Sequence, residues 1–167
     1  MSVSVSGDCD AGHGKKTCIT EDLLQMLMRV NRQGDIITGP KKRIAFLAFV
    51  KGNPILSNNV IKFDDVETNI GNHYSPTTGV FTAPRNGLYV LSSMIMAYGS
   101  TTIQYEWRKN DAVFSHGFTN RGSSSSQSQT FIFELKKGDR IYIKHRTSTG
   151  ERLDGGRFSY FNGYLLE

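Results

Sequence analysis

The residue types that most often carry enzyme chemistry are scattered along this 167-residue chain. The histidines are His13, His73, His116 and His145. No H-E-x-x-H or G-x-S-x-G sequence accompanies them, so neither a zinc peptidase nor a serine hydrolase is indicated. The adjacent carboxylates Asp64 and Asp65 would point to opposite faces of a strand, whereas paired acid catalysts must converge. We therefore expect a protein that is not an enzyme and that has no catalytic residues.

Two cysteines, Cys9 and Cys18, are the other reactive side chains. Eight residues separate them, unlike a close C-x-x-C pair, and with His13 they make only three possible zinc ligands. A disulfide within one chain or between chains is our preferred interpretation, and it favours an oxidising compartment; two unpaired thiols are the alternative. No stretch has the length and hydropathy of a membrane helix or a secretory signal, so a cytosolic protein and a mature secreted chain both stay open.

Charge is distributed unevenly along the chain. Residues 41–167 hold 16 basic and 10 acidic side chains, a net charge of +6, whereas residues 1–40 hold four and five. An excess of positive charge favours an anionic partner such as an acidic glycan, a bacterial lipid or a nucleic acid; a role in solubility alone is the alternative. Nucleic acid is disfavoured because no recognition motif accompanies the charge.

The element most clearly predicted is a short helix over 19–34, between a flexible cysteine-bearing segment (1–18) and a domain over 41–167. Thr20 suits its N-terminal cap and Gly34 its end. A coiled-coil-like spacing joins Ile19, Leu23, Met26 and Val30. The segment 19–40 is thus either a short oligomerising stalk with its linker or a helix packed on its own domain.

From residue 41 onward the pattern is all-β. Three predicted strands, 44–50, 87–98 and 130–135, are apolar on both alternating faces; 102–110, 140–146 and 158–166 are richer in polar or aromatic residues. Turn-forming residues separate them, and the serine run 123–129 is typical of a flexible loop. Short strands at this spacing indicate a sandwich or barrel. Because an antiparallel sheet normally exposes one face to water, the two-sided apolar strands are expected to meet another subunit.

Six spaced positions identify the family that this domain resembles: Phe63, Asn69, Tyr74, Phe81, Gly87 and Tyr89. They stand in the spacing of the C1q domain signature, the globular head of the C1q and tumour-necrosis-factor superfamily. IAFLAFV, FELKKGDRIYI and FNGYLLE are similar to its first strand, the stretch leading into its seventh and eighth strands, and its last strand, so the match runs from about Ile44 to Glu167. Leu91 and Ser93 stand where the signature usually has aromatics. The aromatics of the signature are expected in the core.

The resemblance implies a ten-stranded jelly roll that assembles as a homotrimer. No glycine repeat of a collagen stalk occurs, so the chain is expected to be a head-only, invertebrate-type member. Some relatives bind calcium near the trimer apex through carboxylates in the segment corresponding to 116–129. That segment has none here, so we expect no apical calcium, no cofactor and no bound metal.

The expected function is that of a secreted, extracellular recognition protein of innate immunity. It would bind acidic glycans or microbial surface molecules such as lipopolysaccharide or sialic-acid-type ligands in a lectin-like way, without membrane insertion. An extracellular matrix or biomineral-associated protein and a receptor-binding signalling ligand are the alternatives. The planar guanidinium group of arginine can donate two parallel hydrogen bonds to a carboxylate or phosphate, and the ring of tyrosine can stack on the face of a sugar. The candidate ligand-binding residues are Tyr98, Tyr105, His116, Arg121, Arg146, Arg152 and Arg157. The two tyrosines could instead lie in the trimer interface, and the arginines could simply be solvated.

Overall fold

The computed structural model describes residues 43–120, 125–147 and 150–166, and all of them belong to the compact unit Lys42–Glu167. The expected N-terminal segment and helix lie outside the described residues, so the predictions for the two cysteines and for the helical seam stay predictions. Arg121 also lies outside the described residues.

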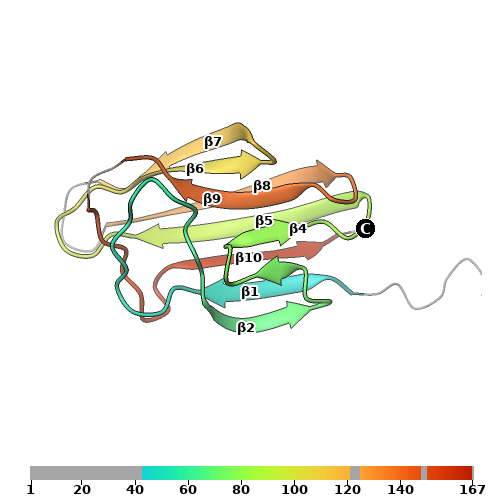
Figure 1. The fold of residues 1–167 in the computed structure, drawn as a ribbon, viewed down its shortest axis with the longest axis horizontal. Coiled ribbons are helices and arrows are strands. Elements are labelled where there is room, and N and C mark those ends of the chain that lie inside the picture. Colours follow the sequence, from blue (N-terminus) through green and yellow to red (C-terminus); the bar gives the residue numbers. More distant parts are fainter. Residues whose placement is uncertain (1–42, 121–124, 148–149, 167) are drawn as a thin grey trace, which may run out of the picture. The chain divides into compact units, whose positions relative to one another are not determined.

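Ten antiparallel strands form two five-stranded sheets (Figure 1). The first sheet has the order β2-β1-β10-β5-β8 and the second has the order β3-β4-β9-β6-β7. The strands are β1 Ala45–Phe49, β2 Asp65–Ile70, β3 Tyr74–Ser75, β4 Val80–Thr82, β5 Gly87–Met96, β6 Gln104–Lys109, β7 Ala112–Phe118, β8 Ser126–Leu135, β9 Arg140–His145 and β10 Tyr160–Leu165. The expected ten-stranded, all-β jelly roll is confirmed.

The two sheets face each other across one aromatic core. Phe46 of β1 stacks on Tyr74 and Phe81 at ring-centroid distances of 4.9 and 5.1 Å, so the first strand of one sheet meets the hairpin of the other. The four aromatics of the signature, Phe63, Tyr74, Phe81 and Tyr89, are all at most 2% exposed. Their expected place in the core is therefore confirmed, and the spacing of these aromatics in the sequence serves to pack the core between the sheets.

One local expectation was wrong. Residues 126–129, predicted as flexible loop from their serine content, are the first residues of β8 and pair with Ser93–Met96 of β5. The polar side chains are accommodated because this part of the strand alternates between partly buried and exposed positions, and the Thr130 hydroxyl meets that of Ser92 at 2.9 Å. Pairing along a ten-residue partner strand overrides the local preference of serine for turns.

The sandwich has two different ends. β1 begins and β10 finishes at one end, which therefore carries the chain ends of the domain (Figure 1). At the opposite end the strands are joined by loops within 50–64, 97–103 and 146–159, and we call this the loop end. Backbone hydrogen bonds tie these loops together, as described below, so they are part of the scaffold that positions exposed side chains.

Candidate functional site

Two of the predicted ligand-binding residues meet at the loop end. Tyr98 follows β5 and Arg152 lies in the 146–159 loop, and the backbone N–H of Tyr98 donates to the Arg152 carbonyl at 3.0 Å. The Arg152 guanidinium carbon lies 5.8 Å from the centroid of the Tyr98 ring. The ring is 43% exposed, and Arg152 makes no ion pair with any described residue. A stacked guanidinium keeps its N–H fork available for a carboxylate or phosphate.

The backbone beneath this pair is tightly connected. Leu56 donates its N–H to the Glu151 carbonyl at 2.8 Å, and Leu153 donates to the Pro54 carbonyl at 3.1 Å, so the 50–64 loop runs beside the Arg152 segment. Gly155 makes this approach possible, because a Cβ there would lie 1.5 Å from the Gly52 carbonyl oxygen. The pair of Tyr98 and Arg152 is thus held on ordered backbone, which lowers the entropy lost when a ligand binds.

A buried polar cluster supports the loop end from inside. The imidazole of His145, fully buried on β9, accepts a hydrogen bond at Nδ1 from the Asn58 N–H at 3.2 Å and meets the Glu151 carboxylate at Nε2. Thr147 contacts the same Nε2 at 3.1 Å and donates to Glu151 at 3.0 Å. Since Nδ1 accepts, the neutral imidazole carries its proton on Nε2 and has no lone pair directed at the threonine hydroxyl. The cluster is built to fasten two loops, and its geometry differs from that of an activated nucleophile.

The other predicted residues are dispersed. Tyr105 was a wrong choice, because its ring is fully buried on β6 and its hydroxyl donates to Gln127 at 3.1 Å. Burial also raises the pKa of this phenol, which keeps it protonated. Its inward position follows from the alternation of side chains along β6. The sequence alone did not show which set of alternate residues faces the core.

Arg157 is exposed but engaged with its neighbours. Its guanidinium lies 2.8 Å from Glu67 and 3.5 Å from Asp65, and it stacks 5.0 Å from the centroid of the Phe49 ring. His116 on β7 and Arg146 after β9 are both exposed on the second sheet. Of the six candidates among the described residues, the structure brings together only Tyr98 and Arg152.

The sequence interpretation missed two cations beside Arg146. Arg140 and Lys144 belong to β9, and both point out of the second sheet. The sequence marks them only in part, because Tyr142 is aromatic at an outward position and His145 is polar at an inward one, so polar and apolar residues do not alternate regularly through 140–146. The pair of Tyr98 and Arg152 has no signal beyond residue type, because 53 residues separate its members along the chain.

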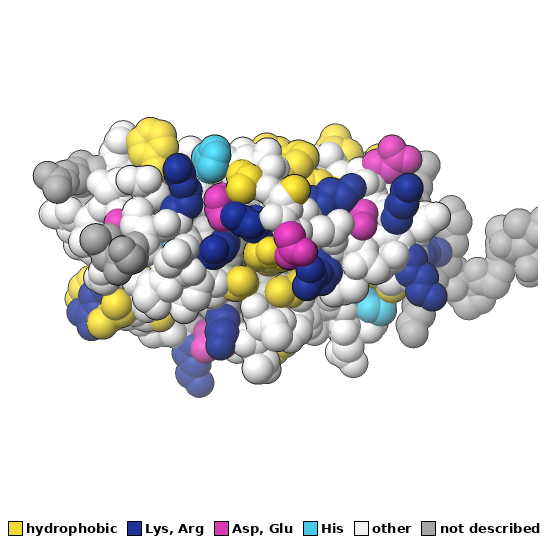
Figure 2. Space-filling view, turned by 45° about the horizontal axis from the view of Figure 1, so that its top comes forward, with side chains coloured by type: hydrophobic (Ala, Val, Ile, Leu, Met, Phe, Trp, Pro, Cys, Tyr) yellow, Lys and Arg dark blue, Asp and Glu magenta, His cyan; other side chains and the backbone are white. Residues whose placement is uncertain are grey.

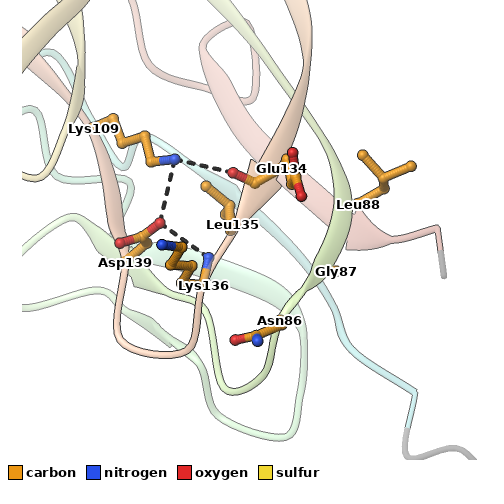
Figure 3. Close-up of a pocket in the computed structure, with 8 residues that line it drawn as sticks. All are labelled: Asn86, Gly87, Leu88, Lys109, Glu134, Leu135, Lys136 and Asp139. Atoms are coloured by element: carbon orange, nitrogen blue, oxygen red, sulfur yellow. Dashed lines mark hydrogen bonds and ion pairs between the residues drawn. The ribbon is translucent and has the colours of Figure 1, made fainter.

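A cavity of about 930 Å³ opens at the end of the sandwich opposite the loop end (Figure 3). Its lining residues are Asn86, Gly87, Leu88, Lys109, Glu134, Leu135, Lys136 and Asp139. The Lys109 ammonium donates to the Glu134 carbonyl at 3.0 Å and lies 3.3 Å from the Asp139 carboxylate. Hydrogen bonds from the Lys136 N–H and the Asn110 amide lower the pKa of Asp139. With two lysines facing two carboxylates, the cavity has no net charge that would attract an anion.

Among the described residues no group of three His, Cys, Asp or Glu side chains is placed to hold a metal ion. In the same part of the chain there is no helix of the length and hydropathy needed to cross a membrane.

The fold and the site together define a class: a jelly-roll sandwich that carries exposed polar residues on its loops and outer faces. Comparison with known proteins identifies the family. The C1q domain model matches residues 45–166. The chain belongs to the C1q domain family.

Two relatives are 34% identical over 131 residues, the mouse and human proteins named complement C1q tumor necrosis factor-related protein 3. The match covers 76% of this chain, and the chain spans about half (52%) of the length of these curated relatives.

Solved structures share the fold. The globular domain of zebrafish complement 1qA protein superposes with a TM-score of 0.62 at 19% identity, covering 74% of this chain and 98% of that one. Eiger TNF from S. frugiperda gives 0.59 at 17% identity (76% and 94% covered), and murine APRIL gives 0.58 at 17% identity (74% and 98% covered).

Proposed function

We propose that the protein is a secreted, homotrimeric recognition protein that binds acidic glycans or microbial surface molecules outside the cell, in the manner of a lectin. The observation that carries the proposal is the exposed guanidinium of Arg152 stacked on Tyr98 at the loop end. The guanidinium fork suits a carboxylate or phosphate of a sialic-acid-type sugar or of lipopolysaccharide, and the edge of the ring offers apolar contact to the sugar face. Binding is non-covalent and uses no cofactor or calcium.

Trimer formation is supported by the apolar outer face of the first sheet. Tyr164 of β10, Val90 of β5 and Ile132 of β8 lie directly opposite one another in a single cross-strand row. Ile132 is 66% exposed and Tyr164 48% exposed, and Leu88 adds to the same face at 41%. Apolar side chains gathered in this way on one face are typical of an interaction surface.

A second apolar surface lies at the edge of the sandwich. Phe114 and Phe118 of β7 are 46% and 56% exposed, and Phe114 packs against Phe133 of β8 at a ring-centroid distance of 4.5 Å. This edge differs from the face of the first sheet, so a contact between the two is heterologous. A heterologous contact closes into a ring when its rotation permits, and we propose closure at three subunits.

Trimerisation determines how weak sites become effective. Three copies would present three Tyr98–Arg152 pairs on one particle, and linking weak sites raises avidity by about 10²–10⁴ when a ligand can engage them together. Repetitive microbial glycans satisfy that condition, whereas a single soluble sugar does not. We therefore expect strong binding to surfaces and weak binding to monosaccharides.

The test is an array of acidic and neutral glycans and microbial polysaccharides, probed with the full chain at physiological salt. Arg152→Gln removes the charge while keeping a polar side chain with N–H donors, and should weaken binding to carboxylate-bearing glycans at least about tenfold, as expected for the loss of a charge-assisted hydrogen bond. Arg157→Gln is the matched control, because that guanidinium already pairs with Asp65 and Glu67.

Binding confined to acidic glycans and lost in Arg152→Gln supports the proposal. Equal binding by both variants contradicts the proposed site, and a blank array contradicts the lectin function. A blank array obtained with trimers present would direct the search to a protein receptor or a matrix partner. The net charge of +6 in residues 41–167 disfavours a mineral-binding role, since mineral surfaces that recruit proteins through calcium attract acidic chains.

A further inference from the structure

The side chains of β9 point alternately into the core and out of the second sheet. Its inward residues are fully buried: Ile141, Ile143 and His145. Its outward positions, continued by the residue that follows the strand, are Arg140, Tyr142, Lys144 and Arg146. Because β9 lies in the middle of the second sheet, between β4 and β6, the three cations follow the centre of its outer face. We call these four residues the β9 row.

The neighbouring strands leave this row positively charged. Arg108 of β6 lies opposite Tyr142, and Glu106 lies opposite Lys144. Glu106 is largely neutralised by Arg108, whose Nε donates to it at 2.7 Å. Lys144 and Arg146 form no ion pair with any described residue. In Figure 2, which turns the edge of β6 and β7 toward the viewer, Lys and Arg side chains are spread along the length of the sandwich, with a few acidic ones between them.

The ion pair at the start of the row is weak. Arg140 reaches Asp111 at 3.2 Å, but the Asp111 side chain is 86% exposed and that of Arg140 49% exposed. Exposed pairs of this kind contribute roughly 0–1 kcal/mol, so a ligand anion can replace Asp111 at little cost. Arg140 is therefore available for binding although it is paired in the isolated protein.

A groove of about 610 Å³ opens at the same end of the row. Three hydroxyl-bearing residues line it, Ser75, Thr78 and Thr82, and its cations are Lys137 and Arg140; none of its lining residues is a carboxylate. Thr82 lies directly opposite Arg140 in the β4–β9 pairing, so a hydroxyl and a guanidinium leave the sheet side by side. Hydroxyls beside cations suit a ligand that carries both hydroxyl and acidic groups.

The dimensions suit an extended ligand. Residues two apart on a strand are about 7 Å apart, so the row from Arg140 to Arg146 extends over about 20 Å. A chain of sugars with acidic groups at intervals can lie along such a row and contact several cations at once. A single-stranded nucleic acid is a poorer match, because binding proteins stack its bases on exposed aromatics and the only ring in the row, Tyr142, is 9% exposed.

We propose that the outer face of the second sheet binds a linear polyanionic glycan, a polyuronate or a sulfated polysaccharide, along the β9 row from the groove at Arg140 and Lys137 to Arg146. This site is separate from the pair of Tyr98 and Arg152, and it rests on the proposed function only in its class of ligand. The outer face of this sheet lacks the apolar row of the first sheet, so it stays accessible when subunits assemble through the first sheet and the β7–β8 edge.

The test uses the full chain and two probes, dextran sulfate and polygalacturonate, with neutral dextran as the blank. The double variant Lys144→Gln/Arg146→Gln should bind both probes at least about tenfold more weakly and with a shallower dependence on salt, because two charge-assisted contacts are lost. Asp111→Asn should bind two- to threefold more tightly, on the order expected for releasing an exposed ion pair. Light scattering and thermal unfolding confirm that the variants assemble and fold.

Arg152→Gln separates this proposal from the preceding one. The β9 row predicts unchanged binding of both probes by Arg152→Gln and weakened binding by the double variant. Weakened binding by Arg152→Gln with unchanged binding by the double variant would overturn the proposed site at the β9 row and support the loop-end site. Equal affinity of the double variant and the unaltered protein would also overturn the proposed site at the β9 row. Tighter binding of a single-stranded DNA oligonucleotide than of either polysaccharide, lost in the double variant, would overturn the choice of ligand.

Discussion

The two sheets of this sandwich share one interior but have different outer faces. Tyr164, Val90 and Ile132 make an apolar row across the first sheet, whereas Arg140, Lys144 and their neighbours make a cationic row across the second. Both rows arise from the same two-residue alternation, so the inward positions of both sheets specify one fold while the outward positions are left for other purposes. The comparison suggests that one face serves assembly of the protein with itself and the other serves its ligands.

The largest expected effect comes from placing a charge on the apolar face. Ile132→Arg would bury an unpaired cation in the proposed subunit contact, so the assembled mass measured by light scattering should fall from three chains to one. Thr82→Arg is the matched control, since it adds the same side chain to an exposed position of the second sheet and should leave the mass unchanged. Trimers that survive Ile132→Arg, or dissociate equally in both variants, would break the division between the faces.

A smaller effect is expected from the shared interior. The Tyr74 hydroxyl is buried, donates to the Phe63 carbonyl at 3.0 Å and accepts from the Phe63 N–H at 3.1 Å. Tyr74→Phe leaves both backbone groups without this partner and should lower the free energy of unfolding by about 1–3 kcal/mol at neutral pH. Tyr98→Phe, at an exposed ring, should change it by less than about 0.5 kcal/mol.

The same residue makes stability depend on alkaline pH. Burial raises the pKa of Tyr74 above its usual value of about 10. Because the unfolded chain then ionises first, the contribution of Tyr74 is complete below about pH 10 and is lost as the pH rises toward its folded-state pKa. The free energy of unfolding, measured with denaturant from pH 9 to 11, should therefore fall less steeply with pH in Tyr74→Phe than in the unaltered protein. An identical slope would show that this phenol does not couple ionisation to folding.

Much of this architecture could be predicted from the sequence because it depends on alternation. All three strands predicted to be apolar on both faces, 44–50, 87–98 and 130–135, contribute to the first sheet, where the apolar outer row lies. Of the strands predicted to be richer in polar or aromatic residues, 102–110 and 140–146 belong to the second sheet, whereas 158–166 contains β10 of the first sheet. The pattern thus identified three strands of the apolar face but missed β10, which contributes Tyr164 to the apolar row.

The candidate site was less predictable because it depends on contacts between distant segments. Tyr98 and Arg152 were chosen for their chemistry, but their meeting follows from the bridge between Ala97 and Leu153, which no local pattern encodes. Tyr105 was chosen for the same chemistry and proved to be core, because residue type does not reveal the phase of a strand. Lys144 was missed for the opposite reason: a lysine between buried residues attracts no notice until its strand is placed in the centre of a sheet.

The most direct test of the division between the two faces is hydroxyl-radical footprinting of the assembled protein, with and without polygalacturonate. We predict that Ile132 and Tyr164 react slowly in both states, although they are 66% and 48% exposed in the single chain, while Lys144 and Arg146 react readily alone and are protected by the polysaccharide. Rapid reaction of Ile132 and Tyr164 in the assembled protein, or protection of Lys144 and Arg146 without ligand, would contradict the account.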